Sequence, residues 1–476
     1  MPFKDLREFI TKLEEEGEAV TIREEVDWNL EAGALVRLAG EKNLPAPFLN
    51  RVKGYPEGYR LFGGTLANFR RIAIAMDMDP DTHPKDLMEE FLVRKKNPMK
   101  PVLVDSGPCK ENIYTGEDLD LTKLPIPMIH EGDGGRFLGT WHITISKEPE
   151  SGWVNWGMYR HMLIDNNTVG ILQTSAAKHL WSMYSNMNGP KDKPMEVAIA
   201  IGVEPISTLC GGTPNPYGIS EVDIVGGLRG EPVELVQCET VDLAVPATAE
   251  IVIEGELRPD DLREEGPFGE YSGYSSAPKT PRPTIHVKAI THRNDPIFTF
   301  SCLGVPLDDN LIWCMAKSAA FLEALRERGF PVTGVYAVPE SSTFFTVVGV
   351  KPVYPGIAAD IAHLIWGIDA AHASPYVVVV GDDVDPFDVP QVLHTLATRC
   401  HPARGIVKAE NCPVTPLLPF LDPQEREYRK GAMVYFDCTW PLDWKPEDVP
   451  NRISFSECYP REVQEKVLKI WNEYGY

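Results

Sequence analysis

Hydrophobic positions at the start of the chain follow the spacing of an amphipathic helix. Apolar side chains recur at i, i+3, i+4 and i+7, which places them on one helix face. They are Leu6, Phe9, Ile10 and Leu13. Gly17 ends this pattern, and the Ala-Val-Thr-Ile of residues 19–22 is typical of a strand. We therefore predict an N-terminal α/β domain over residues 1–118, whose last part, rich in proline and glycine, is an irregular connection.

The middle of the chain, residues 119–304, contains short apolar or alternating runs separated by glycine and proline turns. Such runs are typical of β-strands. They occupy residues 142–146, 195–201, 249–254 and 284–290. The pattern predicts a central sheet or barrel domain.

Helical patterns return after Pro306, and residues 312–325 are the clearest of them. The four valines 377–380 form a short β-branched run, which a buried parallel strand requires. We predict a C-terminal α/β domain with a terminal helix over residues 305–476. The expected fold class is therefore a multidomain mixture of α+β and α/β architecture.

Composition supports this division and restricts the partners. A chain of 476 residues exceeds one hydrophobic core, so two or three domains are expected. The formal net charge of -23, from 46 Lys and Arg against 69 Asp and Glu, repels phosphate backbones and anionic lipids. Nucleic acid and membrane surfaces are not expected partners. An anionic small substrate would need a locally basic pocket, so clustered arginine or lysine near a site is informative.

Cysteine usage and the N-terminus indicate a cytoplasmic protein. The nine cysteines are odd in number and scattered, with no Cys-x-x-Cys pair, so reduced thiols are expected. The first ten residues carry charges where a signal peptide needs an apolar core, and no apolar run has membrane-spanning length.

Common enzymatic signatures are absent from the sequence. It contains neither Gly-x-x-x-x-Gly-Lys-Ser/Thr nor Gly-x-Gly-x-x-Gly after a strand. His-Glu-x-x-His, zinc-type cysteine pairs and Gly-x-Ser-x-Gly are also missing. P-loop, Rossmann, zinc and serine-hydrolase chemistry are therefore disfavoured.

Two carboxylates flank a rigid turn in Glu265-Gly-Pro-Phe-Gly-Glu270. The proline restricts the turn, so both acids can face one cavity. If Phe268 shields one carboxyl from water, its pKa rises and it can hold a proton near neutrality, as a general acid must. An acidic turn is ordinarily a solvated loop, and the residues alone leave both interpretations open.

The segment Trp153-Val-Asn-Trp-Gly-Met-Tyr-Arg160 offers an arginine that can form a bidentate pair with a glutamate or a substrate carboxylate. A surface arginine on an edge strand is the alternative. Asn155, His179 and Glu221 suit a divalent ion such as manganese, but their spacing forms no local signature and each residue type is more often structural.

These motifs resemble, together and in the same order, the UbiD family of reversible decarboxylases. The resemblance covers nearly the whole chain, and the branch it most resembles contains ferulic/cinnamic acid and pyrrole-2-carboxylate decarboxylases. The segments that carry it include residues 153–160, 178–179, 218–221, 245–255 and 265–270, with further matches at 29–34, 45–50, 107–112, 129–135 and 463–467.

The resemblance implies a cofactor, because loss of carbon dioxide from an sp2 carbon leaves electrons that no side chain can accept. In this family the cofactor is prenylated flavin mononucleotide (prenylated FMN), which forms a covalent adduct with the substrate. The central domain would then be a flavin-reductase-like split β-barrel. By resemblance, residues that contact the flavin would be Asn155, Trp156, Gly157, Met158, Tyr159, Arg160, Lys178, His179 and Glu221.

Two metal ions are implied in the same way. Asn155, His179 and Glu221 would bind Mn2+, which holds the flavin phosphate. A K+ ion would lie among Trp153, Cys210, Gly211, Thr213 and Arg399. Asp369 stands near a position where relatives carry a basic residue facing the flavin phosphate, so that contact is either lost or supplied by His372.

The resemblance also assigns roles in the reaction. Glu270 matches the proton donor, while Arg160 and Glu265 match the network that holds the substrate carboxylate and the charge of Glu270. The expected substrate pocket is more polar than in cinnamate enzymes; its residues are Ser175, Lys178, Tyr271, Asn310, Cys314, Thr415 and Leu417. Unpaired polar groups against a bare ring cost about 1 to 3 kcal/mol each, so a hydroxylated or heteroaromatic acid is favoured.

We therefore predict a carboxy-lyase for reversible, non-oxidative decarboxylation of an aromatic, heteroaromatic or α,β-unsaturated acid. Its cofactor would come from a flavin prenyltransferase, and relatives suggest a homodimer or higher homo-oligomer. Two alternatives stay open: an ordinary flavin-dependent oxidoreductase and a non-catalytic assembly subunit.

Overall fold

A computed structural model describes residues 3–172, 179–187, 194–276 and 278–475. The predicted first helix is confirmed as α1 (Leu6–Glu15), which buries all four predicted apolar residues and is capped by the Asp5 carboxylate. It packs on a sheet of order β1-β2-β3-β16, whose last strand comes from far along the chain. The elements of this region are β1 (Ala19–Val26), α2 (Glu31–Glu41), β2 (Ala46–Val52), β3 (Arg60–Gly63), α3 (Phe69–Ala75), α4 (Pro84–Lys95) and β16 (Ile297–Phe300).

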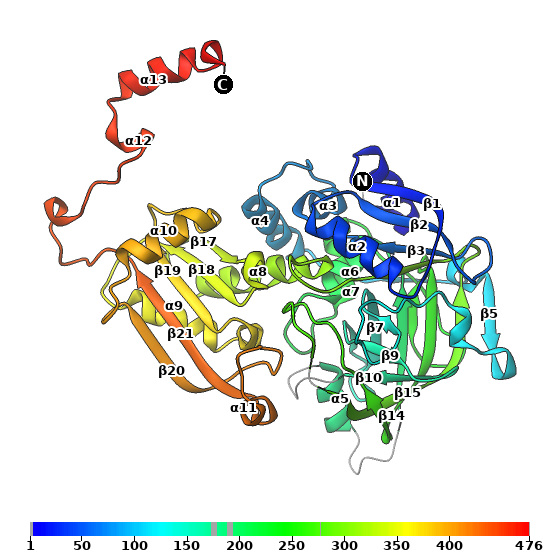
Figure 1. Ribbon diagram of the computed structural model, residues 1–476. Coiled ribbons are helices and arrows are strands. Elements are labelled where there is room, and N and C mark those ends of the chain that lie inside the picture. Colours follow the sequence, from blue (N-terminus) through cyan, green and yellow to red (C-terminus); the bar gives the residue numbers. More distant parts are fainter. Residues whose placement is uncertain (1–2, 173–178, 188–193, 277, 476) are drawn as a thin grey trace.

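A nine-stranded antiparallel sheet forms the centre of the molecule (Figure 1). Its path is β6-β9-β10-β15-β14-β11-β7-β8, and β5 also pairs with β15. The four predicted strand runs are confirmed within it. Strands β14 and β15 are longer than predicted. The outer half of the hairpin they form is mostly polar and exposed, so it lacks the apolar pattern. The strands are β5 (Asn112–Thr115), β6 (Phe137–Gly139), β7 (His142–Lys147), β8 (Val154–Gly157), β9 (His161–Leu163), β10 (Thr168–Ile171), β11 (Met195–Ile201), β14 (Ile251–Glu265) and β15 (Thr280–His292).

Short elements flank this central sheet. The connection predicted as irregular consists of a short strand and three 3-10 turns besides β5. The short elements also comprise a small sheet of order β13-β12-β4 and three helices. These elements are β4 (Val102–Val104), α5 (His179–Met187), α6 (Pro205–Gly211), α7 (Glu221–Arg229), β12 (Glu234–Gln237) and β13 (Ala244–Pro246).

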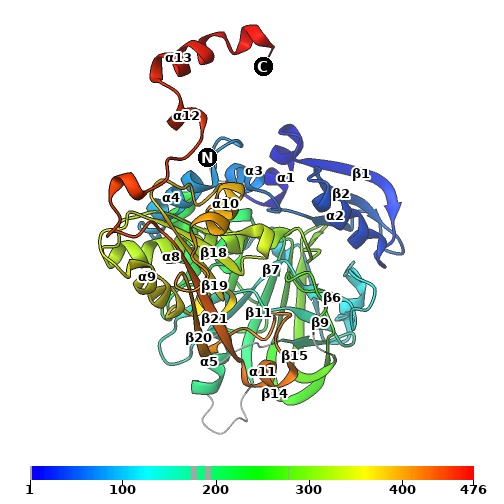
Figure 2. The same cartoon turned by 60° about the vertical axis from the view of Figure 1, so that its left-hand side comes forward.

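The C-terminal region is a five-stranded mixed sheet of order β17-β18-β19-β21-β20 covered by helices (Figure 2). The predicted valine strand is confirmed: Val377–Val380 are fully buried in β19, between two parallel neighbours. The elements are α8 (Ile312–Glu327), β17 (Val332–Ala337), β18 (Phe345–Val350), α9 (Ile357–Trp366), β19 (Tyr376–Gly381), α10 (Val389–Arg399), β20 (Ile406–Pro413), α11 (Pro423–Tyr428), β21 (Lys430–Cys438), α12 (Phe455–Cys458) and α13 (Arg461–Ile470).

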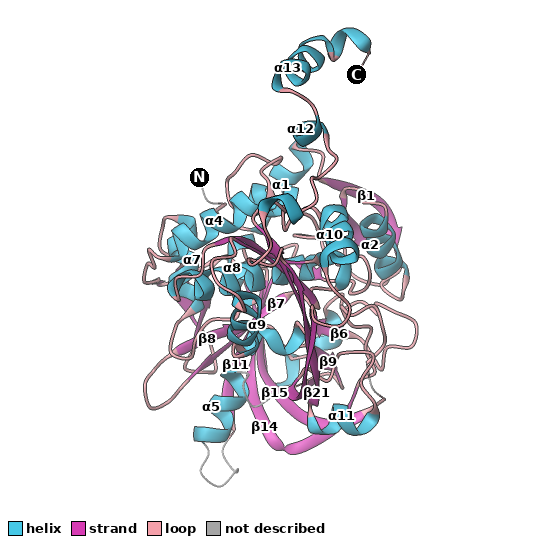
Figure 3. Cartoon of the chain, turned by 90° about the vertical axis from the view of Figure 1, so that its left-hand side faces the viewer, coloured by secondary structure: helices cyan, strands magenta, loops and turns pink. Residues whose placement is uncertain are grey.

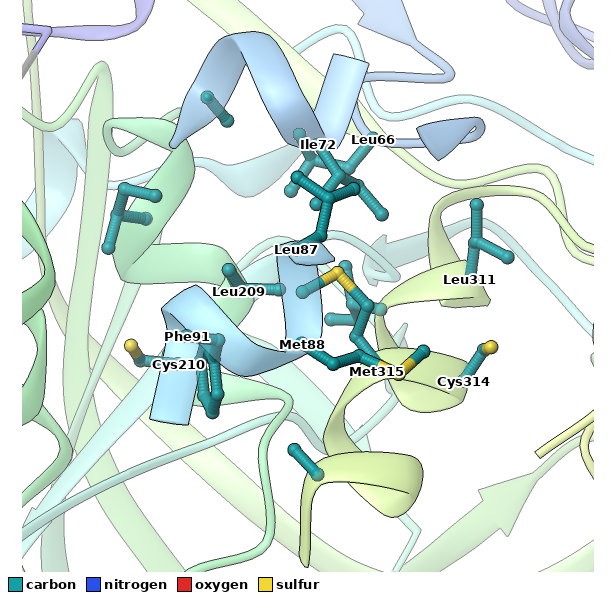
Figure 4. Packing of buried hydrophobic residues seen from close by; sticks show 14 of the residues in the cluster. Leu66, Ile72, Leu87, Met88, Phe91, Leu209, Cys210, Leu311, Cys314 and Met315 are labelled. Atoms are coloured by element: carbon teal, nitrogen blue, oxygen red, sulfur yellow. The ribbon is translucent and has the colours of Figure 1, made fainter. Parts of the chain in front are cut away.

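Helix α8 joins the three regions through one hydrophobic cluster (Figure 4). Met315 of α8 lies beside Met88 of α4, and Leu209 of α6 packs near them. The segment with α12 and α13 instead extends away from the body in all three views (Figure 3). Within the described ranges, no helix has the length and apolar character needed to cross a membrane.

Candidate active site

A cavity of about 480 Å³ lies between the central sheet and the C-terminal region. Its volume falls in the range of small-molecule sites. The central sheet contributes Asn155–Arg160 and Glu270, and the C-terminal region contributes Trp313 and Thr415. Polar and charged groups therefore meet in a cavity with mostly hydrophobic surroundings.

Arg160 connects the two acids of the predicted turn. It follows β8, and its Nε and Nη2 donate to the Glu265 carboxylate at 2.7 and 2.8 Å. Its Nη1 donates to Glu270. The side chains are 11, 1 and 7% exposed for Arg160, Glu265 and Glu270, so this is a buried network rather than a surface ion pair. The two carboxylates are unequal, because Glu265 takes the bidentate pair and Glu270 a single contact.

Burial raises the pKa of Glu270 above its ordinary value, although Arg160 opposes the shift. The shield expected from Phe268 is present: its buried ring packs 4.2 Å from that of Phe137, and the Arg160 guanidinium lies 5.3 Å from the Phe268 ring centroid. A carboxyl with a raised pKa and a neighbouring cation can hold a proton and release it to a bound reactant.

The loop before β6 fixes the turn that carries Glu270. Asp133 accepts from the Gly269 N–H at 2.8 Å, and the Gly134 N–H donates to Pro267 O at 2.7 Å. A Cβ on Gly134 would lie only 1.8 Å from the Gly266 oxygen, so this close approach requires glycine. The position of Glu270 therefore depends on residues far from it in sequence.

Asn155, His179 and Glu221 all line the same cavity. Asn155 Oδ1 lies 2.8 Å from His179 Nδ1, close to the roughly 3 Å between adjacent ligands of an octahedral ion with bonds of about 2.1 Å. Glu221, the first residue of α7, accepts from the Trp156 N–H at 2.9 Å, and burial raises its pKa to about 7. In the described ranges no three His, Cys, Asp or Glu side chains cluster, but this set includes an amide oxygen. The donors suit a divalent ion.

Buried polar atoms beside this set also fit a bound group. Among the described residues, Asn155 Nδ2 and Trp156 Nε1 are buried without a hydrogen-bond partner, although both residues line the cavity. Native proteins rarely leave such atoms unsatisfied. Gly157, Met158 and Tyr159, also predicted to contact the flavin, line the cavity too.

The residues predicted around potassium are only partly brought together. Gly211 and Thr213 line the cavity after α6, and Cys210 is buried behind them. Trp153 packs against His179, with ring centroids 5.2 Å apart. Arg399 does not reach the cavity: its guanidinium forms a bidentate pair with Asp383 at 2.9 and 2.6 Å. The assignment of Arg399 to the potassium site stays a prediction.

The predicted substrate pocket is also partly assembled. Tyr271, Asn310, Thr415 and Leu417 line the cavity, whereas Ser175 and Lys178 lie outside the described residues. Cys314 was predicted to line the pocket, and the structure corrects this. The register of α8 turns Trp313, Ala316 and Lys317 toward the cavity and Cys314 into the hydrophobic cluster (Figure 4). His372 lines the cavity, and the Asp369 side chain is not described.

Of the cavity residues that sequence reasoning missed, four bear on the site. Asn215 donates to Glu221 at 3.4 Å, and no motif marked it. Lys317 donates to Thr343 Oγ1 at 2.7 Å, and a lone charge in the apolar first half of α8 was a usable signal. The others are Trp313 and Arg429.

Family models match three consecutive parts of the chain. They describe the N-terminal, Rift-related and C-terminal domains of 3-octaprenyl-4-hydroxybenzoate carboxy-lyase (UbiD), and they match residues 10–91, 100–306 and 310–438. The pyrrole-2-carboxylic acid decarboxylase of Pseudomonas aeruginosa is 32% identical over 489 residues, covering 99% of this chain and 98% of that protein.

Solved structures agree with this match. Vanillic acid decarboxylase of Sedimentibacter hydroxybenzoicus in closed form has a TM-score of 0.89 and 30% identity, with all of both chains covered. HmfF from Pelotomaculum thermopropionicum, in complex with FMN, has a TM-score of 0.83 and 31% identity over 94% of this chain and 97% of that chain. An evolved dimeric HmfF in complex with prFMN has a TM-score of 0.81 and 30% identity over 94% and 97%. The mixed α+β multidomain fold is thus that of UbiD-class enzymes, and the chain belongs to the UbiD family of carboxy-lyases.

Proposed function

We propose that this protein is a prenylated-FMN-dependent decarboxylase of aromatic, heteroaromatic or α,β-unsaturated acids. One observation carries the proposal: Arg160 holds Glu265 and Glu270 in a buried network that shares a cavity with Asn155, His179 and Glu221. Relatives named as decarboxylases, and relatives with FMN or prFMN bound, support it.

The roles of the protein's own residues follow from this geometry. When bound, the flavin would accept the electron pair released with carbon dioxide. Arg160 has three donor nitrogens engaged with carboxylates and can orient the substrate carboxylate. Glu265 keeps the guanidinium in place. Glu270, whose pKa is raised, delivers the proton that replaces carbon dioxide, and the reverse reaction uses the same group as a base.

Asn155, His179 and Glu221 would bind Mn2+ at the flavin phosphate, where their converging donors and the elevated pKa of the unmetallated Glu221 favour a cation. A K+ ion would lie among Trp153, Cys210, Gly211, Thr213 and Arg399. We keep domain limits of 1–118, 119–304 and 305–476, with a flavin-reductase-like split barrel in the centre. The nine free cysteines favour a reducing, cytoplasmic location.

We also propose a homo-oligomer. The extended segment around α12 and α13 exposes Ile453, Leu468 and Tyr474 by 87, 63 and 67%. Large apolar side chains on a segment that leaves the body are stabilised when another surface covers them. A second copy of the chain fits this role, and one relative is described as dimeric.

The test is to produce the chain with and without a flavin prenyltransferase, then to measure the mass and visible spectrum of the extracted cofactor. We expect prenylated FMN only from co-production, and carbon dioxide release from aromatic acids only with that protein. Unmodified FMN that supports redox turnover would favour the oxidoreductase. Protein without flavin or metal from both preparations would favour the assembly subunit.

A further inference from the structure

Arg429 gives the cavity a positive charge that no acid of the described chain neutralises. It caps α11 in the left-handed conformation, with φ 52°, and lines the cavity beside Thr415 and Leu417. No hydrogen bond or ion pair of the guanidinium occurs among the described residues. Half-buried charges normally find a partner.

A second arginine, Arg282, lies near Arg429. Arg282 of β15 is half-buried, and its Nε is buried without a hydrogen-bond partner in the described ranges. Burial, and then the Arg282 charge, lower the pKa of Arg429, so the two cations are near one another. Arg282 also interacts electrostatically with Glu265 and Arg160, and on β15 it lies two residues from Thr280, the strand partner of Glu265.

This arrangement contrasts with other buried arginines in the chain. Arg71 pairs with Glu18, Arg293 with Asp5 and Arg399 with Asp383. Among the described residues Arg282 and Arg429 form no ion pair, although the protein has a net charge of -23, and Arg429 lines the cavity that holds the candidate site. Two neighbouring positive charges are stabilised by an anion that binds between them or to the more exposed of the two.

We propose that Arg429, with Arg282 behind it, binds a second anionic group of the substrate, so that the preferred substrates are ring-bearing dicarboxylic acids. Arg160 takes the carboxylate that leaves, and Arg429 takes the carboxylate that stays. This inference rests on the proposed function, since it names the substrate class of the same cavity. The inference also specifies the polar group on the ring as a second carboxylate, because a planar guanidinium forms a bidentate pair with a carboxylate.

The experiment compares matched acids on the flavin-loaded protein. The pairs are benzoate and terephthalate, cinnamate and 4-carboxycinnamate, and pyrrole-2-carboxylate and pyrrole-2,5-dicarboxylate. We measure kcat/KM for carbon dioxide release and, independently, Kd by calorimetry. In at least one pair we expect the diacid to be favoured by about 10- to 100-fold, the usual size of one charge-assisted hydrogen bond. Arg429→Gln should remove that preference, because kcat/KM and affinity fall more for the diacid than for the monoacid.

Arg263→Gln is the control, since Arg263 lies opposite Arg282 on β14 but is exposed and pairs with Asp261. It should keep the preference for the diacid. Equal affinity for both members of every pair, or an unchanged preference in Arg429→Gln, would overturn the inference and leave the decarboxylase assignment standing. Loss of flavin from Arg429→Gln would also overturn it, since the arginine would then serve the cofactor. If no acid releases carbon dioxide, the proposed function fails, and the calorimetric comparison still decides whether Arg429 selects dianions.

Discussion

Replacing Glu270 by glutamine separates the proton donor from the residues that hold it. The amide keeps the size of the side chain and still accepts from Arg160, but it has no acidic proton. General acid catalysis contributes about 100- to 10,000-fold in rate, which is about 3 to 5.5 kcal/mol of barrier. We therefore expect turnover of Glu270→Gln to fall by at least about 100-fold, with the flavin still bound.

The stability of this variant should move in the opposite direction. Since burial raises the folded-state pKa of Glu270 above the unfolded value, the protonated form stabilises the fold below the unfolded pKa, and this contribution is lost as pH rises through the folded pKa. A neutral glutamine avoids the cost of the buried charge at higher pH. The Tm of Glu270→Gln should equal or exceed that of the wild type at pH 8.

Glu265→Gln is the matched control, because it is the same chemical change five positions away. It breaks the bidentate pair that Glu265 makes while it is only 1% exposed. Breaking a buried ion pair costs about 3 to 5 kcal/mol, and the lower end applies because Glu270 still contacts Arg160. In a domain of this size, 3 kcal/mol lowers Tm by at least about 6 °C.

The assays are carbon dioxide release, flavin absorbance and thermal unfolding of the three proteins side by side. Full activity in Glu270→Gln would refute its role as proton donor. An equal fall of Tm in both variants would refute the unequal division of Arg160 between the two acids.

Four further results are expected. In the wild type, turnover should decrease as pH rises through the folded pKa of Glu270, which lies above its ordinary value; a pH-rate profile with no such limb would contradict this. Gly134→Ala places a methyl group 1.8 Å from the Gly266 oxygen, so turnover should fall by about tenfold or more while flavin content is kept. Gly367→Ala is the comparison, because the nearest atom to its added methyl group lies at 3.4 Å and its φ is -77°. Removal of divalent metal by a chelator should release flavin, and Mn2+ should restore its retention in an absorbance assay; flavin that stays bound would argue against the metal set. Truncation after Val449 removes the exposed segment and should convert the oligomer to monomer in light scattering, and an unchanged mass would exclude this segment as the interface.

The sequence predicted those parts of the fold in which a local pattern matches the burial. The helix face of Leu6 and Phe9 and the valine strand Val377–Val380 are examples, because their neighbours bury the same positions that the periodicity marks. The outer half of the β14–β15 hairpin was missed, since its register is fixed by pairing rather than by apolar residues. The sheet partner β16 could not be foreseen either, because it joins β3 from more than 200 residues away.

The predicted site residues show the same difference between local patterns and long-range contacts. A resemblance brought Arg160, Glu265 and Glu270 together, but their unequal contacts depend on three-dimensional positions 105 and 110 residues apart. Cys314 was misplaced, because one step of register in α8 exchanges cavity and core. A lone charge in an apolar context would have indicated Lys317, whereas Arg429 follows a polar turn and gives no such signal.

The charged side chains at the substrate end of the cavity link the choice of substrate to the protonation of Glu270. Arg160, Arg282 and Arg429 bring three positive charges, and Glu265 brings one negative charge. If Glu270 is protonated, as its raised pKa favours, this group carries two positive charges in excess, which a dicarboxylate would neutralise. A monoacid would leave one charge of this group unbalanced, and an ionised Glu270 would balance it. A monoacid therefore favours the deprotonated form of the proton donor, and a diacid favours the protonated, reactive form. The selection of the substrate and the readiness of Glu270 are thus coupled through the same three arginines, so Arg429→Gln should also shift the pH limb that reports Glu270 when a diacid is bound.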